Sequence, residues 1–512
     1  MLSKIYTASL IGINGDIVCV ETDLTRGLPA FNLVGLGDKI IKESGERIRS
    51  AMLNSDLKYP QSRITINLSP ANKPKEGSHF DLPIALGILV ASLTSTVNNS
   101  NKMGIFGELS LDGKVNRING ALPLVLCAKE NGLNKVIVPT ENAKEAALVK
   151  DMEVIPVDTL KEAFGYLIGE IKIEPEINVE ICDDELAECF DYKDIYGQEN
   201  AKRALMICAA GGHGILMIGS PGVGKTVLAR ALPSILPRLT YLEKLEVTKI
   251  YSVAGFLTKE KPMITNRPYK SPHSSISPAA LIGGGRNPKP GEISLAHRGV
   301  LFLDELSQFD SKILDLLRIP IEDGTVQIAR RAGNVTFPAK TILVAASNPC
   351  KCGYAGDDTH ICTCTAGQLS NYMAKLSAPI LDRIDLHIKV NNVNYDEIEI
   401  KGGLSSKDML NKVISARKIQ EARYKNDLID LNSEIAANQM DKYCLLEVKE
   451  KELMEMAYVN LNLSVRTYMK VIRIARTIAD LDNSEQIQIH HLTEALQYRG
   501  LENLYRRNSH GN

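Results

Sequence analysis

Residues 214–232 combine three local patterns that leave little choice of structure. An apolar run over 214–218 is followed by the octapeptide GSPGVGKT and then by the helix-forming residues 227–232. This order predicts a strand, a loop and a helix, with backbone N–H groups turned towards a polyphosphate at the positive end of the helix. The pattern therefore predicts a site for ATP or GTP made of Gly219, Ser220, Pro221, Gly222, Val223, Gly224, Lys225 and Thr226.

A second, acidic pattern supports the first. The apolar run 300–303 ends in Asp304 and Glu305, which predicts a buried strand with two carboxylates at its tip. Asp304 and the Thr226 hydroxyl are suited to hold hydrated Mg²⁺, while Lys225 reaches the β- and γ-phosphates. Glu305 is suited to orient and polarise the water that attacks the γ-phosphorus. The alternative is that the two carboxylates cap the start of the next helix.

The length and the net charge of the chain limit the number of domains and the kinds of partner that we expect. At 512 residues it is too long for one core, and we expect about three domains. The formal charge of -1 gives no overall attraction to nucleic acid or to an anionic membrane, so contact with a polyanion must be local. The most apolar stretch, 82–93, is too short to span a bilayer, and the N-terminus lacks a cleavable leader. We therefore expect a cytoplasmic protein with no membrane partner.

The pattern of apolar residues changes along the chain. Short β-rich runs and helical periods are mixed over 1–172, which predicts an α+β domain, and the acidic segment 173–190 is typical of a linker. Over 191–392 strands alternate with helices, which predicts an α/β domain with a mostly parallel sheet covered on both faces. Over 393–512 strand signals vanish, and the periods 408–424, 441–458, 465–481 and 491–498 predict a helical domain.

A polar residue follows another apolar run. The strand predicted over 341–346 leads to Asn348, whose amide can hydrogen-bond both the γ-phosphate and the lytic water. The alternative is an ordinary turn, because Asn-Pro is common in turns.

These motifs follow one another in an order that resembles the order of motifs in AAA+ ATPases. The order is DIYGQ at 194–198, the GSPGVGKT loop, VLFLDE at 300–305, Asn348, LDRID at 381–385 and SVR at 464–466. The run GEISLAHRGVLFLDE, which starts at Gly291, narrows the resemblance to the magnesium-chelatase-like branch and specifically to the YifB/ComM family. The resemblance implies an AAA+ core with a helical lid, preceded by a domain similar to the proteolytic domain of Lon proteases.

The resemblance also implies roles for single residues. Tyr196 and Gly197 would contact the nucleotide, and Asn348 would be sensor 1. Arg383 would be an arginine finger that reaches the γ-phosphate of a neighbouring subunit, and Arg466 would be the sensor-2 arginine of the lid. A guanidinium suits a phosphoryl-transfer transition state because it offers forked donors and a permanent charge. A finger supplied by a neighbour implies a ring, and the family implies a homo-hexamer.

Residues 325–340 alternate apolar and polar side chains around Ala-Gly-Asn and predict a β-hairpin that carries Arg330 and Arg331. In related motors this hairpin faces the central pore, so the two arginines are candidates for contact with a DNA backbone. The alternative is solvated charge at a hairpin tip.

Four cysteines lie in one short segment directly after Asn348. They form two Cys-x-Cys pairs, and four thiolates can close a tetrahedral Zn²⁺ site, although this spacing is tighter than in the usual zinc knuckle. His360 is a spare candidate ligand, and free or redox-active thiols are the alternative. The candidate ligands are Cys350, Cys352, Cys362 and Cys364.

The resemblance to Lon proteases, carried by 74–81 and 107–115, does not extend to the catalytic dyad. The position of the nucleophilic serine is His79, with Ser78 one residue away, and the position of the general-base lysine is Leu122. We therefore expect a degenerate domain used for assembly or DNA binding, without peptidase activity.

Two functions remain. The family resemblance implies a ring-forming ATP-driven motor that acts on DNA, as a helicase or in branch migration during recombination or natural transformation. The alternative is a protein-remodelling or metal-insertion ATPase like the magnesium chelatase motor subunit.

Overall fold

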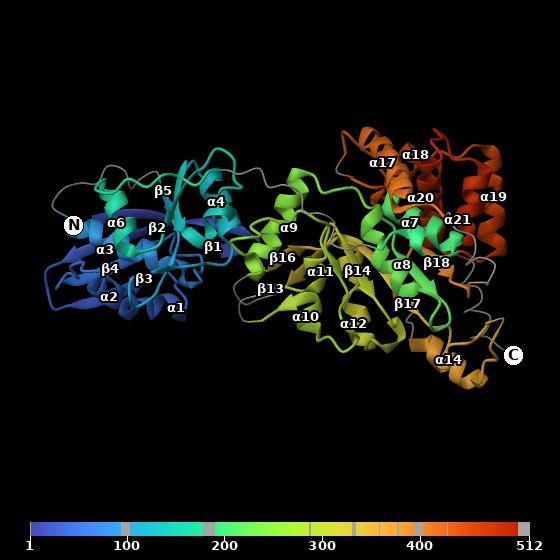
Figure 1. The fold of residues 1–512 in the computed structure, drawn as a ribbon, viewed down its shortest axis with the longest axis horizontal. Helices are drawn as coiled ribbons and strands as arrows, with labels where there is room; N and C mark the ends of the chain where they lie inside the picture. The colour runs from blue at the N-terminus through green and yellow to red at the C-terminus, as the bar shows by residue number, and fades with distance from the viewer. Residues whose placement is uncertain are drawn as a thin grey trace.

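The computed structural model describes residues 2–93, 103–177, 190–285, 288–329, 334–357, 359–375, 378–393, 403–427 and 429–499. The molecule is elongated, with a mixed sheet and its helices at one end, a parallel sheet in the middle and the C-terminal helices at the other end (Figure 1). No helix within these ranges has the length and apolar character needed to cross a membrane.

The N-terminal sheet has seven strands in the order β3-β4-β2-β1-β5-β8-β9. Strands β1, β2 and β4 pair antiparallel, while β5, β8 and β9 are parallel. The bounds are β1 Leu2–Ile11, β2 Asn14–Thr25, β3 Ala30–Val34, β4 Arg63–Ser69, β5 Met103–Ile105, β8 Lys135–Pro139 and β9 Glu153–Val157.

Helices cover both faces of this sheet. Successive strand residues point to opposite faces, so Ile137 joins one core while Val136 and Val138 join the other. The first core contains α2 (Ser44–Asn54), α3 (Asp81–Ser92) and α6 (Leu160–Ile168), and the second contains α4 (Ala121–Glu130) and α5 (Ala143–Ala146). The predicted α+β mixture is therefore present in this part of the chain.

The central sheet has five parallel strands in the order β11-β14-β17-β10-β18. Every residue of β10, β14 and β17 is buried, because helices cover both faces, and this explains their continuous apolar runs. The predicted parallel sheet with two covered faces is thus confirmed. The bounds are β10 Ile215–Ile218, β11 Tyr269–Lys270, β14 Val300–Leu303, β17 Ile342–Ser347 and β18 Leu386–Lys389.

The C-terminal helices pack on one face of the central sheet. They share a core with α7 (Glu199–Gly211) and α8 (Lys225–Ala231). The predicted helix over 441–458 is wrong at its start, because the chain is interrupted after Tyr443 where Cys444 and Leu446 pack into this core and override local propensity. The helices are α17 Ser406–Arg423, α18 Met440–Tyr443, α19 Val448–Asn460, α20 Val465–Leu481 and α21 Ile489–Gln497.

The N-terminal part is docked on the central part at two places. Helix α4 packs against α9 (Tyr241–Ala254), where the Gly120 N–H donates to the Ser252 carbonyl (3.0 Å) and the Ser252 hydroxyl donates to buried Glu145. At the second place, partly buried Ile13 in the turn between β1 and β2 packs against the core of the central part. The same turn approaches the hairpin formed by β15 (Thr325–Ile328) and β16 (Val335–Pro338).

Candidate nucleotide-binding and hydrolysis site

The glycine loop lies at the C-terminal edge of the central sheet, between β10 and α8. Gly222 (φ 83°) and Gly224 (φ 89°) adopt left-handed conformations, which explains why the loop uses glycine at these positions. Lys225, the first residue of α8, is buried and donates hydrogen bonds to the carbonyls of Gly219 (2.7 Å) and Ser220 (2.9 Å). Burial lowers the pKa of Lys225. The ammonium group is therefore held directly beneath the loop.

The acidic pair lies beside the loop. The Thr226 hydroxyl donates to Asp304 (2.9 Å), so the two residues predicted to hold Mg²⁺ are in contact. Glu305 adopts a left-handed backbone conformation (φ 49°, ψ 51°), and such strain in a non-glycine residue is concentrated at functional sites. Glu305 occupies the N-cap position of the short helix Leu306–Gln308, but its carboxylate makes no capping hydrogen bond to that helix. The oxygens of Thr226 and Asp304 form a donor set of the kind that Mg²⁺ prefers.

Asn348 completes this edge of the sheet. It follows β17, the neighbour of β10, and its side-chain oxygen accepts a hydrogen bond from Lys225 (3.2 Å). The Asn348 amide therefore lies beside Lys225, and its contact with a γ-phosphate stays a prediction.

A cavity of about 1070 Å³ is lined by the DIYGQ segment, and Gln198 in its wall donates to the Val223 carbonyl of the glycine loop (3.5 Å). The Gln198 side chain donates to the Asn391 carbonyl (2.6 Å) across the cavity wall, which links the DIYGQ segment to the chain after β18. Half-exposed Tyr196 and Gly197 both line it, so the two residues predicted to contact nucleotide lie at a cavity large enough for a nucleoside.

Arg383 and Arg466 lie together, but at the other edge of the sheet. Arg383 Nε is 2.8 Å from a carboxylate oxygen of Glu322, and the Arg466 guanidinium contacts the same oxygen. Arg383 precedes β18, which runs parallel to β10 and begins beside Ile215. The glycine loop follows the last residue of β10, so the length of the strand, roughly 13 Å, separates it from the level of the two arginines. The structure therefore places Arg383 and Arg466 at the edge of the sheet opposite to Lys225, and their roles in hydrolysis stay predictions.

Sequence reasoning missed Lys470, which ties the lid to the segment that carries Arg383. Lys470 Nζ donates to the Arg383 carbonyl (2.7 Å) and pairs with Asp385 (2.7 Å). The signal was present, because Arg466, Lys470 and Arg473 follow one another at i, i+4 and i+7 on α20 and so share a helix face. Glu322 has no comparable sequence signal.

The buried pair of Lys470 and Asp385 predicts a measurable stability change. Burial by itself raises the pKa of Asp385, but Lys470 and His213 outweigh burial and hold that pKa well below its usual range. An Asp385→Asn variant leaves Lys470 unpaired, and we expect the free energy of unfolding of the core to fall by about 3–5 kcal/mol in urea titrations followed by circular dichroism. Asp315→Asn, which breaks an exposed pair with Arg318, is the control, with an expected loss under about 1 kcal/mol.

The same pair has a defined pH dependence. Because the folded-state pKa of Asp385 is depressed, the pair stabilises the fold above the unfolded-state pKa of about 3.9 and loses this effect as the pH falls further. The difference in the free energy of unfolding between wild type and Asp385→Asn is thus expected to be constant near neutral pH and to shrink below about pH 4. A difference that grows on acidification would contradict this assignment.

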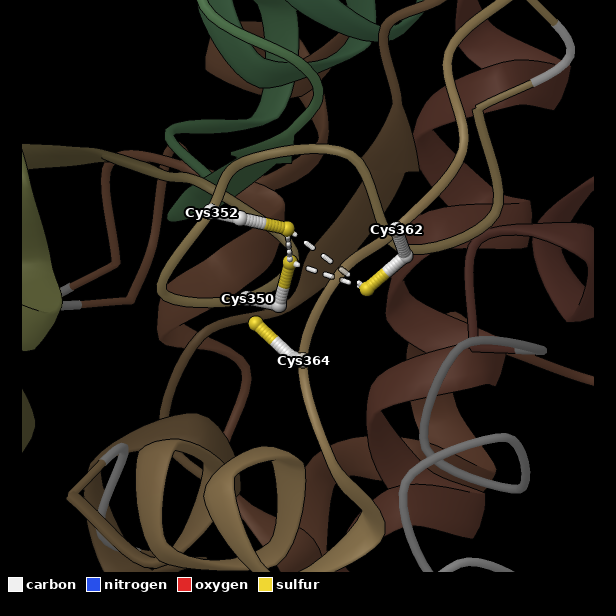
Figure 2. A group of neighbouring side chains, drawn as sticks. All are labelled: Cys350, Cys352, Cys362 and Cys364. Atoms are coloured by element: carbon white, nitrogen blue, oxygen red, sulfur yellow. Dashed lines mark hydrogen bonds between the residues drawn. The ribbon is translucent and has the colours of Figure 1, made fainter.

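The sequence also offers the hairpin arginines as candidates for DNA contact and the four cysteines as candidates for a metal site. Strands β15 and β16 pair antiparallel with Ile328 opposite Val335, which confirms the predicted hairpin, while Arg330 and Arg331 lie outside the described residues. The four cysteines after Asn348 come together (Figure 2). His360 is not one of the metal-competent group found among the described residues, and its ring stacks on Tyr354.

The positions that the sequence resemblance pairs with the Lon catalytic dyad lie in the N-terminal part and are His79 and Leu122. Within the described residues the Ser78 hydroxyl donates to Glu108, and Leu122 is buried in the core. His79 is buried, and its Nε2 lies 2.9 Å from the Ala8 carbonyl oxygen. Burial lowers the pKa of His79 to about 4, so this imidazole is neutral at physiological pH.

A parallel sheet with a glycine loop after β10, an acidic pair after β14 and a helical lid define a P-loop ATPase of the AAA+ class. The protein named Competence protein ComM of Haemophilus influenzae is 40% identical to this chain over 511 residues, which is 98% of each sequence. The chain therefore belongs to the ComM/YifB family of magnesium-chelatase-like AAA+ ATPases. Membership of this family implies ATP and Mg²⁺ as the ligands of the site.

Other comparisons agree with this assignment. The protein YifB of Salmonella typhimurium is 39% identical over 98% of each chain. The magnesium-chelatase 38 kDa subunit of Cereibacter sphaeroides is 28% identical over 176 residues, 31% of this chain and 53% of that protein. Family models match 191–398 (magnesium chelatase, subunit ChlI), 403–499 (magnesium chelatase, subunit ChlI C-terminal) and 20–142 (subunit ChlI of Mg-chelatase).

Proposed function

We propose that this protein is a cytoplasmic, ring-forming motor that couples ATP hydrolysis to movement on DNA, with a homo-hexamer as the working form. In this proposal residues 191–392 hydrolyse ATP and 393–512 form the lid. Residues 1–172 serve assembly or DNA binding without proteolysis, and 173–190 join them to the core. The proposed substrates are single-stranded or branched DNA, in branch migration during recombination or natural transformation.

Each side chain at the C-terminal edge of the sheet has a proposed task. Lys225 and the loop amides bind the phosphates, while Thr226 and Asp304 hold Mg²⁺ and its water shell. Glu305 orients the attacking water, and Asn348 positions the γ-phosphate. Mg²⁺ neutralises charge on the phosphate oxygens when it is bound. These five side chains therefore bind and align the reactants, but none of the five is an arginine that could offer a guanidinium to the transition state.

The position of Arg383 and Arg466 carries the proposal of a ring. Both guanidiniums contact Glu322 on α13 (Arg318–Asp323), at the edge of the sheet opposite to Lys225. A second copy that presents this edge to the loop of the first completes the site. Such a contact joins two different surfaces and is therefore heterologous, and heterologous contacts close into rings when the rotation allows.

The choice of DNA rests on two supports. A relative that is 40% identical along the full chain is named a competence protein, and the β15–β16 hairpin ends in a tip whose sequence contains Arg330 and Arg331. Each arginine at such a tip can neutralise one phosphate and release its counterions.

ATPase measurements test this choice. We expect single-stranded or branched DNA to stimulate hydrolysis, and an Arg330→Ala, Arg331→Ala double variant to lose this stimulation while its basal rate is unchanged. The slope of log affinity against log salt is expected to fall by about 0.7–0.9 for each lost phosphate contact. Stimulation by DNA that is identical in the double variant would remove the hairpin from the DNA contact.

The second candidate is a remodelling or metal-insertion motor like magnesium chelatase. It is favoured by the match of 191–398 to the magnesium chelatase model and by the 176 residues shared with the 38 kDa subunit. No response to any DNA structure, together with stimulation by a protein client, would support this candidate over the DNA motor.

A further inference from the structure

The four cysteines after β17 lie on one loop that folds back on itself (Figure 2). The sulfur of Cys350 is 3.2 Å from that of Cys352 and 3.8 Å from that of Cys362, and the sulfurs of Cys352 and Cys362 are 3.5 Å apart. The Cys364 sulfur completes a group whose members all lie within 4.8 Å of one another. Two Cys-x-Cys arms, ten residues apart in sequence, thus converge on one point.

The sulfur separations fit one tetrahedral ion. Zn–S bonds of about 2.3 Å in a tetrahedron place the sulfurs roughly 3.8 Å apart, close to the observed distances. The Ala355 N–H donates to the Cys350 sulfur (3.3 Å), an outer hydrogen bond of the kind that orients metal-bound thiolates. Four thiolates would leave no open coordination position, which is the arrangement of a structural site rather than a catalytic one.

The same loop lies against the glycine loop. Asp357 accepts hydrogen bonds from the Ser220 hydroxyl and from the Asn392 side chain (3.2 Å). A Cβ on Gly353 would be 2.7 Å from Pro221, so the two loops touch at a glycine in a left-handed conformation (φ 92°). Asn348 begins this segment, so the cysteine loop connects two sides of the nucleotide site.

We propose that Cys350, Cys352, Cys362 and Cys364 bind one structural Zn²⁺, and that the ion holds the loop over Ser220 and Pro221. The ion braces the segment between Asn348 and Asp357, because two arms bound to one centre cannot separate. Zn²⁺ therefore preorganises the nucleotide site without touching the nucleotide.

Metal analysis tests the binding directly. Wild-type chain, purified without added zinc in a reducing buffer, is expected to contain about one Zn²⁺ per chain. A Cys352→Ser, Cys362→Ser double variant is expected to contain almost none, while Cys19→Ser, which removes a half-buried thiol outside the loop, keeps the metal. Replacement by Co²⁺ is expected to give the visible absorption of a tetrahedral thiolate complex, a readout that holds even where the double variant folds poorly.

Two results would overturn the metal site. One is folded, reduced wild-type protein that binds no Zn²⁺ or Co²⁺ after equilibration with excess metal. The other is Zn²⁺ content that is the same in the double variant and in Cys19→Ser. Both measurements are made without ATP or DNA, so their failure is separate from any failure of the proposed motor function.

Binding of a fluorescent ADP analogue tests the bracing. Removal of Zn²⁺ by a chelator is expected to weaken ADP binding by about tenfold, and added Zn²⁺ to restore it, since the hydrogen bonds between the two loops are lost with the ion. Asp357→Ala is expected to weaken ADP binding similarly while it keeps its Zn²⁺. ADP affinity that is unchanged in both samples would refute the bracing.

Discussion

An Arg383→Ala chain is expected to hydrolyse ATP at least about 10³-fold more slowly than wild type while it binds ATP with unchanged affinity. The reason is the position of this side chain, which pairs with Glu322 at the edge of the sheet opposite to Lys225. The side chain cannot bind the nucleotide of its own chain there, so its loss affects turnover in a neighbour and spares ground-state binding. Steady-state phosphate release and equilibrium ATP binding measure the two effects.

Mixing two inactive chains makes this prediction specific. A Lys225→Ala chain loses the ammonium group beneath the glycine loop but keeps Arg383, so a mixture with Arg383→Ala chains contains interfaces at which both groups are intact. We expect the mixture to recover part of the wild-type rate, although neither variant is active alone. Arg49→Ala, which removes an exposed arginine of α2, is the control and is expected to leave the rate unchanged. Full activity of Arg383→Ala alone, or no recovery on mixing, would contradict a shared site.

A Glu305→Gln chain is expected to bind ATP and Mg²⁺ normally but to turn over at least about 10²-fold more slowly. The amide keeps the shape of the side chain and removes the base that polarises the water, while Thr226 and Asp304 still hold the metal. ATP is therefore trapped intact, and the ring is expected to be more stable with ATP than the wild-type ring. Rapid-quench analysis of bound nucleotide and size-exclusion chromatography measure both.

A substitution of the neighbouring carboxylate, Asp304, is expected to have a different effect from Glu305→Gln. Asp304→Asn is expected to raise the Mg²⁺ concentration needed for half-maximal hydrolysis and to slow turnover, because Asp304 and Thr226 are the residues proposed to hold the metal. If Glu305→Gln hydrolysed ATP at the wild-type rate, or shifted the Mg²⁺ dependence as Asp304→Asn does, the two carboxylates would not have the separate tasks proposed.

The parts of the site that sequence predicts are those built within short segments. The GSPGVGKT loop and VLFLDE each contain a strand and the turn after it, so local geometry alone places Lys225 and Asp304 at strand ends. Parallel strands end at the same edge of a sheet, and this brings Lys225, Thr226, Asp304 and Asn348 together as predicted.

The contacts that sequence does not predict join distant segments. Nothing near Glu322 indicates that it will pair with arginines from two other segments, because this pairing depends on how α20 packs against the chain before β18. In the same way, residues 39–54 form two helices, α1 (Lys39–Lys42) and α2, with a break at Glu43. Tertiary packing decides where such breaks fall, and the spacing of apolar residues along the sequence contains no information about tertiary packing.

The two docking places of the N-terminal part determine how a cut chain would behave. Buried Glu145 accepts a hydrogen bond from the Ser252 hydroxyl, and partly buried Ile13 packs against the apolar core of the central part. These contacts hold the two parts together independently of the peptide that connects them. A single nick by a protease between residues 178 and 189 would therefore produce two fragments that co-migrate until a denaturant separates them.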